Sequence, residues 1–261
     1  MKKESGERGK HFWEKAWSGL CFFLGFYGRE LLFPRRCPVC DRPVKGLGRL
    51  CCESCKDRLE PVTGAWCLKC GKPLSTAGEK GTDGYCHDCS RGEHCFTRGR
   101  SVFTYDSAAL SLYRFKYGGR QEYADYYGTA AACMLREEES FREADALVPV
   151  PLHPSRQKKR GYNQAKVFAD ALSKHLGVPV REDLVIRCRK TEPMKLLNPA
   201  DRQNNLKKAF KIARNDVKLK TIILIDDIYT TGSTIDAVSR VFLEQGVHKI
   251  YFVTLAVGKG I

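Results

Sequence analysis

The segment from residue 221 to 234, TIILIDDIYTTGST, restricts the possible folds of this chain more than any other part of the sequence. Residues 222–225 are a continuous run of β-branched and aliphatic side chains, which is typical of a strand buried on both faces of a parallel sheet. Two acids follow this run, and a short loop rich in hydroxyl groups comes next. Apolar residues then recur at helical spacing, at Ile235, Val238, Val241 and Phe242. This order of strand, loop and helix predicts an α/β protein.

The loop between the acids and the helix has the composition of a phosphate site. A loop that enters a helix presents unpaired backbone N–H groups and the positive end of the helix dipole. We expect Ser233 or Thr234 to cap this helix. Neither a P-loop nor a dinucleotide fingerprint is present. Carboxylates accept hydrogen bonds from vicinal sugar hydroxyls or reach a divalent cation, so the segment predicts a sugar-phosphate site. The alternative, a buried strand before an ordinary capped helix, does not explain two adjacent acids.

This segment resembles the phosphoribosyl-pyrophosphate (PRPP) motif of type I phosphoribosyltransferases. That motif consists of a hydrophobic strand, two acids and a loop of Thr, Gly and Ser. The resemblance implies that Asp226 and Asp227 bind the ribose hydroxyls and that Mg²⁺ accompanies PRPP. It assigns the 5′-phosphate to Thr230, Thr231, Gly232, Ser233 and Thr234, and we include Tyr229 in the predicted PRPP site.

Eight cysteines form four Cys-x-x-Cys pairs, separated by 11, 11 and 15 residues. Each pair offers two thiolates from one turn, and two pairs complete a tetrahedral zinc site. We predict a double zinc-ribbon module over residues 34–96, with two closed, structural Zn²⁺ sites. The predicted ligands are Cys37, Cys40, Cys52 and Cys55 for one site, and Cys67, Cys70, Cys86 and Cys89 for the other. Spacing leaves interleaved pairing open, and redox sensing and a secreted disulfide scaffold are the competing interpretations.

The amino-terminal residues 1–33 precede this module. We expect residues 1–11 to be disordered and the aromatic, apolar residues 12–33 to form an amphipathic helix. The uncharged run over residues 17–28 is too short to span a bilayer. The helix is expected to pack on the zinc module, with peripheral membrane contact as the alternative. No cleavable signal is evident, and we expect a cytoplasmic protein.

Positive charge is concentrated in residues 146–220, which contain 18 Lys and Arg against 6 Asp and Glu. Such a field attracts pyrophosphate or a nucleic-acid backbone, and a solvated basic face without a partner is the third interpretation. Residues 146–151 predict a buried strand, and a basic loop over 152–164 leads into a helix ending near residue 176. The candidate pyrophosphate or DNA-backbone residues are Arg156, Lys158, Lys159, Arg160 and Arg202.

The predicted strands alternate with helices over residues 97–261, which indicates a parallel or mixed sheet flanked by helices. The strands are expected near residues 100–105, 146–151, 184–188, 221–227 and 249–257. Ligands of such sheets bind at the carboxyl ends of the strands. The basic loop and the acidic pair therefore share one sheet edge, where a single ligand can contact both.

The order of motifs along the chain resembles the ComF family, in which a zinc-ribbon module precedes a phosphoribosyltransferase-like domain. The resemblance rests on the cysteine module, the PRPP motif, and the segments Pro149-Val-Pro-Leu-His-Pro154, Arg160-Gly-Tyr-Asn-Gln164 and Arg202-x-x-Asn205. It implies a role in natural transformation and DNA uptake, with other cytosolic competence proteins as partners.

Three functions follow from these patterns. The first is PRPP binding combined with single-stranded DNA binding, for which Tyr162 and Phe168 are nearby aromatic residues. The second is phosphoribosyl transfer to an unidentified acceptor. The third is a zinc-ribbon scaffold that recruits a partner. Met194 stands where family members commonly carry Gln, and Met cannot make the hydrogen bonds of an amide, so we expect binding more firmly than turnover.

Overall fold

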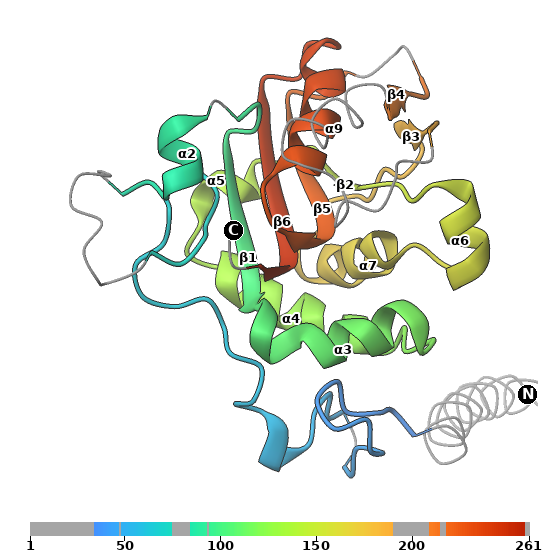
Figure 1. Cartoon of the computed structure of the whole chain (residues 1–261). Coiled ribbons are helices and arrows are strands. Elements are labelled where there is room, and N and C mark those ends of the chain that lie inside the picture. Colours follow the sequence, from blue (N-terminus) through green and yellow to red (C-terminus); the bar gives the residue numbers. More distant parts are fainter. Residues whose placement is uncertain are drawn as a thin grey trace, which may run out of the picture.

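The computed structural model describes residues 34–46, 48–74, 84–92, 94–189, 209–214 and 218–258. The expected amino-terminal tail and helix, Met194 and Arg202 lie outside the described residues. The central sheet has four strands in the order β1-β6-β5-β2 (Figure 1). All three neighbouring pairs are parallel. The strands are β1 (Arg98–Thr104), β2 (Ala146–Pro149), β5 (Thr221–Tyr229) and β6 (Lys249–Val257). The predicted α/β class with a parallel sheet is confirmed.

Helices connect these strands. The helices between β1 and β2 are α3 (Tyr105–Tyr117), α4 (Tyr123–Leu135) and α5 (Glu139–Arg142). The later helices are α6 (Pro154–Arg160) and α7 (Gln164–Leu176) after β2, and α9 (Ser233–Leu243) between β5 and β6. The cysteine module adds the 3-10 helix η1 (Glu53–Cys55) and the short α2 (His87–Arg91). No helix within the described ranges is long and apolar enough to cross a membrane.

Two hydrophobic cores cover the two faces of the sheet. On β5, Ile223 and Ile225 belong to the core formed with α3, α4 and α7, while Ile222 and Leu224 belong to the core formed with α9. Successive side chains of a strand point to opposite faces, so a strand that is buried on both sides must be apolar at every position. This explains the continuous apolar run in the sequence. Figure 1 shows α3, α4 and α7 on one side of the sheet and α9 on the other.

The expectation that residues 184–188 join the main sheet is wrong. Residues Val185–Arg187 form β3, which pairs antiparallel with β4 (Phe210–Ile212) in a separate two-stranded sheet. Val185 is buried and Ile186 is 49% exposed. One-sided burial of this kind is typical of a small antiparallel pair rather than a strand inside a parallel sheet.

The basic segment expected as a loop after β2 contains the helix α6. Pro154 occupies the first turn, where its missing N–H has no cost, and His153 caps the helix by accepting a hydrogen bond from the Ser155 N–H. Gly161 ends the helix in the left-handed conformation, with φ of 82°. Pro154 and Gly161 are signals of a helix start and a helix end that can be read in the sequence. The high density of positive charge led instead to the prediction of a loop.

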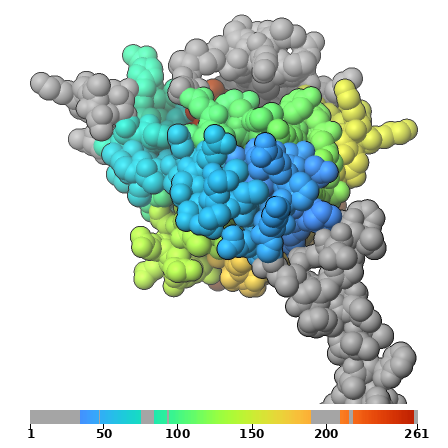
Figure 2. Space-filling view, turned by 90° about the horizontal axis from the view of Figure 1, so that it is seen from below, coloured from blue at the N-terminus to red at the C-terminus, as the bar shows by residue number. Residues whose placement is uncertain are grey.

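Two zinc ribbons lie at different places on this domain. The first ribbon (residues 34–58) lies across α3 and α4, as the blue surface on the green helices shows in Figure 2. The second ribbon (described residues 65–74 and 84–92) packs into the same core as α9. A short connector, residues 94–97, joins the second ribbon to β1.

Candidate functional site

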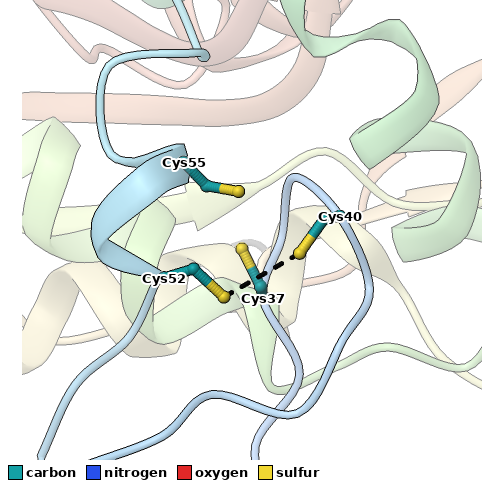
Figure 3. A group of neighbouring side chains, drawn as sticks. All are labelled: Cys37, Cys40, Cys52 and Cys55. Carbon is teal, nitrogen blue, oxygen red and sulfur yellow. Dashed lines mark hydrogen bonds between the residues drawn. The ribbon is translucent and has the colours of Figure 1, made fainter.

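Each ribbon brings four cysteine sulfurs together. One group consists of Cys37, Cys40, Cys52 and Cys55 (Figure 3), the other of Cys67, Cys70, Cys86 and Cys89. All ligand atoms within a group lie within 4.8 Å of one another. Four sulfurs placed tetrahedrally around zinc lie about 3.8 Å apart, given a Zn–S bond of about 2.3 Å. The Sγ atoms of Cys40 and Cys52 are 3.8 Å apart. The residues therefore fit structural Zn²⁺, with consecutive rather than interleaved pairing of the Cys-x-x-Cys motifs.

The acidic pair lies within the end of β5 rather than after it. The strand continues to Tyr229, and Asp226 lies opposite Thr254 of β6. The backbone N–H of Asp227 donates a 2.8 Å hydrogen bond to Asp226 Oδ1. Regular strand geometry therefore holds the two carboxylates at the carboxyl edge of the sheet.

The phosphate loop (residues 230–234) leads directly into α9. Gly232 is the N-cap, with φ of 79°, and no side chain caps the helix. The expectation that Ser233 or Thr234 caps it is wrong, because both residues already belong to the first turn; the Ser233 hydroxyl instead bonds to the Thr231 hydroxyl at 2.9 Å. The residues of the loop line a small pocket together with Asp226. The start of α9 thus presents its backbone N–H groups and its dipole to this pocket.

A lysine that the sequence analysis missed completes the electrostatics of the acids. Lys116, near the end of α3, lies with its Nζ 2.6 Å from Asp227 Oδ2. Burial, together with the adjacent charge of Asp227, raises the pKa of Asp226 to about 7, although Lys116 and Arg187 oppose this rise. The acids therefore form a partly neutralised pair. Only the packing of α3 at the sheet edge brings Lys116 there, and we find no local sequence signal for it.

The predicted basic residues do not all lie at the acids: some interact with β3 and others with α3. Burial and the charge of Arg156 lower the pKa of Arg187 in β3, while Asp226 opposes this effect, so these three side chains interact electrostatically. Arg160 instead donates a 3.0 Å hydrogen bond to the Tyr117 hydroxyl. Lys158 and Lys159 are exposed on α6. Of the predicted set, Arg156 thus interacts with Arg187, which in turn interacts with Asp226. Arg160 is bonded to α3.

The aromatic residues named from the sequence are buried, or partly buried in the case of Tyr162. Phe168 is fully buried, the Tyr162 hydroxyl donates to the Phe115 carbonyl, and Tyr229 stacks on Phe252 with ring centroids 4.7 Å apart. Exposed rings lie on α3 instead, where Tyr113 and Tyr117 are 62% and 55% exposed. Their i, i+4 spacing on the polar face of a helix was a usable sequence signal.

Comparison with known proteins identifies two kinds of domain in this chain. Residues 29–90 match the double zinc ribbon domain, and residues 163–260 match the phosphoribosyl transferase domain. Competence protein F of Haemophilus influenzae is 28% identical over 205 residues, which cover 76% of this chain and 86% of that protein. The DNA utilization protein YhgH of Salmonella typhimurium is 26% identical over 224 residues, which cover 83% of this chain and 94% of that protein.

Competence protein ComFC of Bacillus subtilis is 31% identical over 205 residues, which cover 75% of this chain and 78% of that protein. Its likeness extends well beyond the short motifs of the zinc and phosphate sites. With this identity, and with the two domains matched in the same order, the chain belongs to the ComF family of competence proteins.

Proposed function

We propose that this protein serves natural transformation in the cytoplasm by binding PRPP with Mg²⁺ and by binding single-stranded DNA. The observation that carries PRPP binding is the juxtaposition of the two acids, the uncapped start of α9 and the basic residues of α6 and β3 at one sheet edge. The names of the relatives support the role in transformation, and other competence proteins are the partners that such a role implies.

Each part of PRPP has a chemically matched group in this site. The 5′-phosphate suits the backbone N–H groups and dipole at the start of α9. The ribose hydroxyls suit the carboxylates of Asp226 and Asp227, and the pyrophosphate suits Arg156 and Arg187. Mg²⁺ prefers carboxylate and phosphate oxygens, so it would bridge this end of the ligand and the acids. Lys116 neutralises Asp227 in the absence of ligand.

Calorimetric titration with Mg-PRPP tests this assignment. We expect Asp227→Asn to weaken binding about tenfold or more, because a charged hydrogen-bond acceptor is removed. Asp183→Asn is the matched control, since Asp183 pairs with Arg181 on the exposed surface at 2.8 Å. Equal affinities of the wild type and Asp227→Asn, or no binding by the wild type, would contradict the proposal.

The acidity of Asp226 adds a second readout. Its pKa of about 7 means that it loses its proton near neutral pH. Since only the ionised carboxylate offers both oxygens as acceptors, affinity should rise as the pH increases through this value. In Asp226→Asn, only the pH dependence of affinity that the ligand phosphates cause should remain. A wild-type dependence identical to that of Asp226→Asn would remove Asp226 from the site.

Single-stranded DNA binding is supported by the surface formed by α3 and α6. The rings of Tyr113 and Tyr117 lie 5.2 Å apart, and the Arg160 guanidinium lies 4.9 Å from the Tyr117 ring. Exposed rings stack on bases, while Lys158 and Lys159 would contact phosphates. Anisotropy titrations with an oligonucleotide and its duplex test this surface. We expect Tyr117→Ala to weaken single-strand binding by about 1–3 kcal/mol. Equal affinity for duplex and single strand, or no effect of Tyr117→Ala, would contradict base stacking.

The phosphoribosyl transferase domain makes catalysis the second candidate function. Arg156, Arg187 and Mg²⁺ would stabilise a departing pyrophosphate, and the acids and phosphate loop would hold the ribose in place. Pyrophosphate release in the presence of nucleobases, amines or nucleic-acid ends tests transfer. Saturable PRPP binding without release under any of these conditions would leave binding as the function.

A further inference from the structure

The connector after the second ribbon holds the start of α9 through one carboxylate. His94 Nδ1 lies 2.8 Å from Asp236 Oδ2, and the backbone N–H of Cys95 donates a 2.8 Å hydrogen bond to Asp236 Oδ1. Asp236 lies in the first turn of α9, directly after the phosphate loop. Both oxygens of this side chain are therefore engaged by the connector rather than by solvent.

The same connector supports the phosphate loop from beneath. A methyl group added to Gly232 would lie 2.8 Å from the Tyr229 hydroxyl and 3.0 Å from Cε1 of His94. Gly232 also has a positive φ of 79°, so both its conformation and its surroundings require glycine. His94 and Tyr229 thus pack closely against Gly232, the middle residue of the loop.

The packing beneath Gly232 extends to the metal ligands of the second ribbon. Tyr229 is buried in the same cluster as Cys67 and Cys70 of the second ribbon. Phe96 stacks on His94, with ring centroids 4.7 Å apart, and meets Tyr229 edge-on at 6.2 Å. Cys67, Cys70 and Phe96 are at most 1% exposed and belong to one core with Tyr229. Buried side chains therefore connect the four sulfurs to the loop without an intervening layer of solvent.

We propose that the second zinc site positions the phosphate loop through Tyr229 and the His94–Asp236 pair, so that zinc binding and ligand binding are linked. This inference rests on the proposed PRPP site. A bound ion would hold Cys70, and the core around Tyr229, in one position. Without the ion, part of the free energy of ligand binding is spent on ordering the phosphate loop, so the affinity falls. Linkage is reciprocal, so the ligand must tighten zinc binding by the same factor.

The first ribbon provides an internal control for this linkage. Its Asp41 accepts a 2.7 Å hydrogen bond from the Tyr123 hydroxyl and pairs with Arg120 Nε at 2.9 Å. These partners lie at the start of α4 and just before it, whereas Asp236 lies beside the phosphate loop. Asp41 thus binds the first ribbon to the start of α4, whereas Asp236, in the first turn of α9, binds the connector that follows the second ribbon.

The test compares Asp236→Asn with Asp41→Asn in the full-length, zinc-loaded chain. Calorimetry with Mg-PRPP should show about a tenfold loss of affinity for Asp236→Asn, because a charged hydrogen bond between the connector and the start of α9 is weakened. Asp41→Asn should stay within about twofold of the wild type. In a second measurement, saturating PRPP should slow chelator-induced zinc release from the wild type and from Asp41→Asn, and less so from Asp236→Asn.

Hydrogen exchange of residues 230–235 without ligand separates this inference from the proposed function. Faster exchange in Asp236→Asn than in Asp41→Asn supports the linkage even if the wild type does not bind PRPP. Conversely, wild-type binding together with unchanged affinity and exchange in Asp236→Asn overturns the linkage and leaves the PRPP site standing. If Asp236→Asn does not fold, His94→Asn serves in its place, since its amide nitrogen can retain the bond to Asp236 while the contact with Gly232 is lost.

Discussion

The two zinc ribbons share a ligand set but differ in how they are attached to the rest of the molecule. The first ribbon is held by partly exposed polar contacts, such as Arg35 to Asp125 at 2.7 Å and the Arg114 guanidinium to the Val39 carbonyl at 2.9 Å. The second ribbon contributes Cys67 and Cys70, both 0% exposed, to the core beneath the phosphate loop. The same metal chemistry therefore produces a surface module in one case and part of the domain interior in the other.

This difference decides whether the loss of zinc unfolds one ribbon alone or the whole domain. Zinc supplies the folding free energy of a ribbon through its own ligands. How far the loss of the ion spreads depends on the interface, because burial of apolar area makes two elements unfold together, whereas exposed ion pairs contribute little. We therefore expect the second ribbon to unfold with the domain and the first ribbon to detach from it.

The largest difference should follow the loss of one zinc ligand. Cys70→Ser should lower the free energy of unfolding of the whole chain by about 4 kcal/mol or more, because a metal site inside the core is lost. Cys40→Ser should change the main unfolding transition by less than about 1 kcal/mol, although it also releases zinc. Urea unfolding followed by circular dichroism, with zinc content measured in parallel, tests this. Equal effects of the two variants would break the comparison.

One apolar residue at the interface of each ribbon tests the docking without replacing a zinc ligand. Phe96 is 1% exposed, and Phe96→Ala should cost about 3–5 kcal/mol in unfolding free energy because a large cavity remains. Val39 is only partly buried against α3 and α4, and Val39→Ala should cost about 1 kcal/mol. Denaturant titrations of both variants give these values. A cost below about 1 kcal/mol for Phe96→Ala would show that the second ribbon does not depend on the core.

Salt should loosen the first ribbon and leave the second in place. Raising the ionic strength from about 0.1 to about 1 M shortens the screening length from about 10 to about 3 Å and weakens partly exposed pairs such as Arg35 with Asp125. Hydrogen exchange over residues 37–44 should accelerate severalfold, while exchange over residues 67–72 stays unchanged. Parallel acceleration in both ribbons would indicate that they dock by the same forces.

The smallest effect is expected at the outer surface of the first ribbon. Glu53 is 67% exposed at its side chain and pairs with Lys56 at 2.7 Å and with Arg49 at 3.5 Å. Glu53→Gln should leave the unfolding temperature unchanged, because solvent already screens these charges. Thermal unfolding is a sufficient measurement. A clear fall in the unfolding temperature would mean that surface charge, rather than docking, stabilises this ribbon.

Much of the sheet was predictable because local patterns report burial. The apolar run before Asp226 indicates a strand covered on both faces, and the structure confirms this in the alternating assignment of Ile222 and Ile223 to the two cores. The strand nevertheless extends to Tyr229, since pairing with β6 continues past the acids. Charge and polarity suggested an end to the strand, but the neighbouring strand determines where pairing stops.

The candidate site was predictable only in part, because local patterns do not report partners from distant segments. The acids and the phosphate loop are adjacent in sequence, so their motif is visible without a structure. Lys116 pairs with Asp227 from another helix. Arg187 interacts electrostatically with Asp226 from the two-stranded sheet, whose strand β3 was wrongly expected within the main sheet. Neither interaction leaves a local signal, because nothing in the residues around Lys116 or Arg187 reports a partner elsewhere in the chain.

The sequence by itself determined the elements whose causes are local. The four Cys-x-x-Cys turns, the doubly buried strand and the glycine of the phosphate loop each follow from ligand spacing, apolar periodicity or backbone freedom. Only the tertiary structure decided that one ribbon docks on α3 and α4 while the other supports Gly232 through His94 and Tyr229. The physical reason is that two ribbons with the same ligands differ only in their neighbours, and packing between distant segments chooses those neighbours.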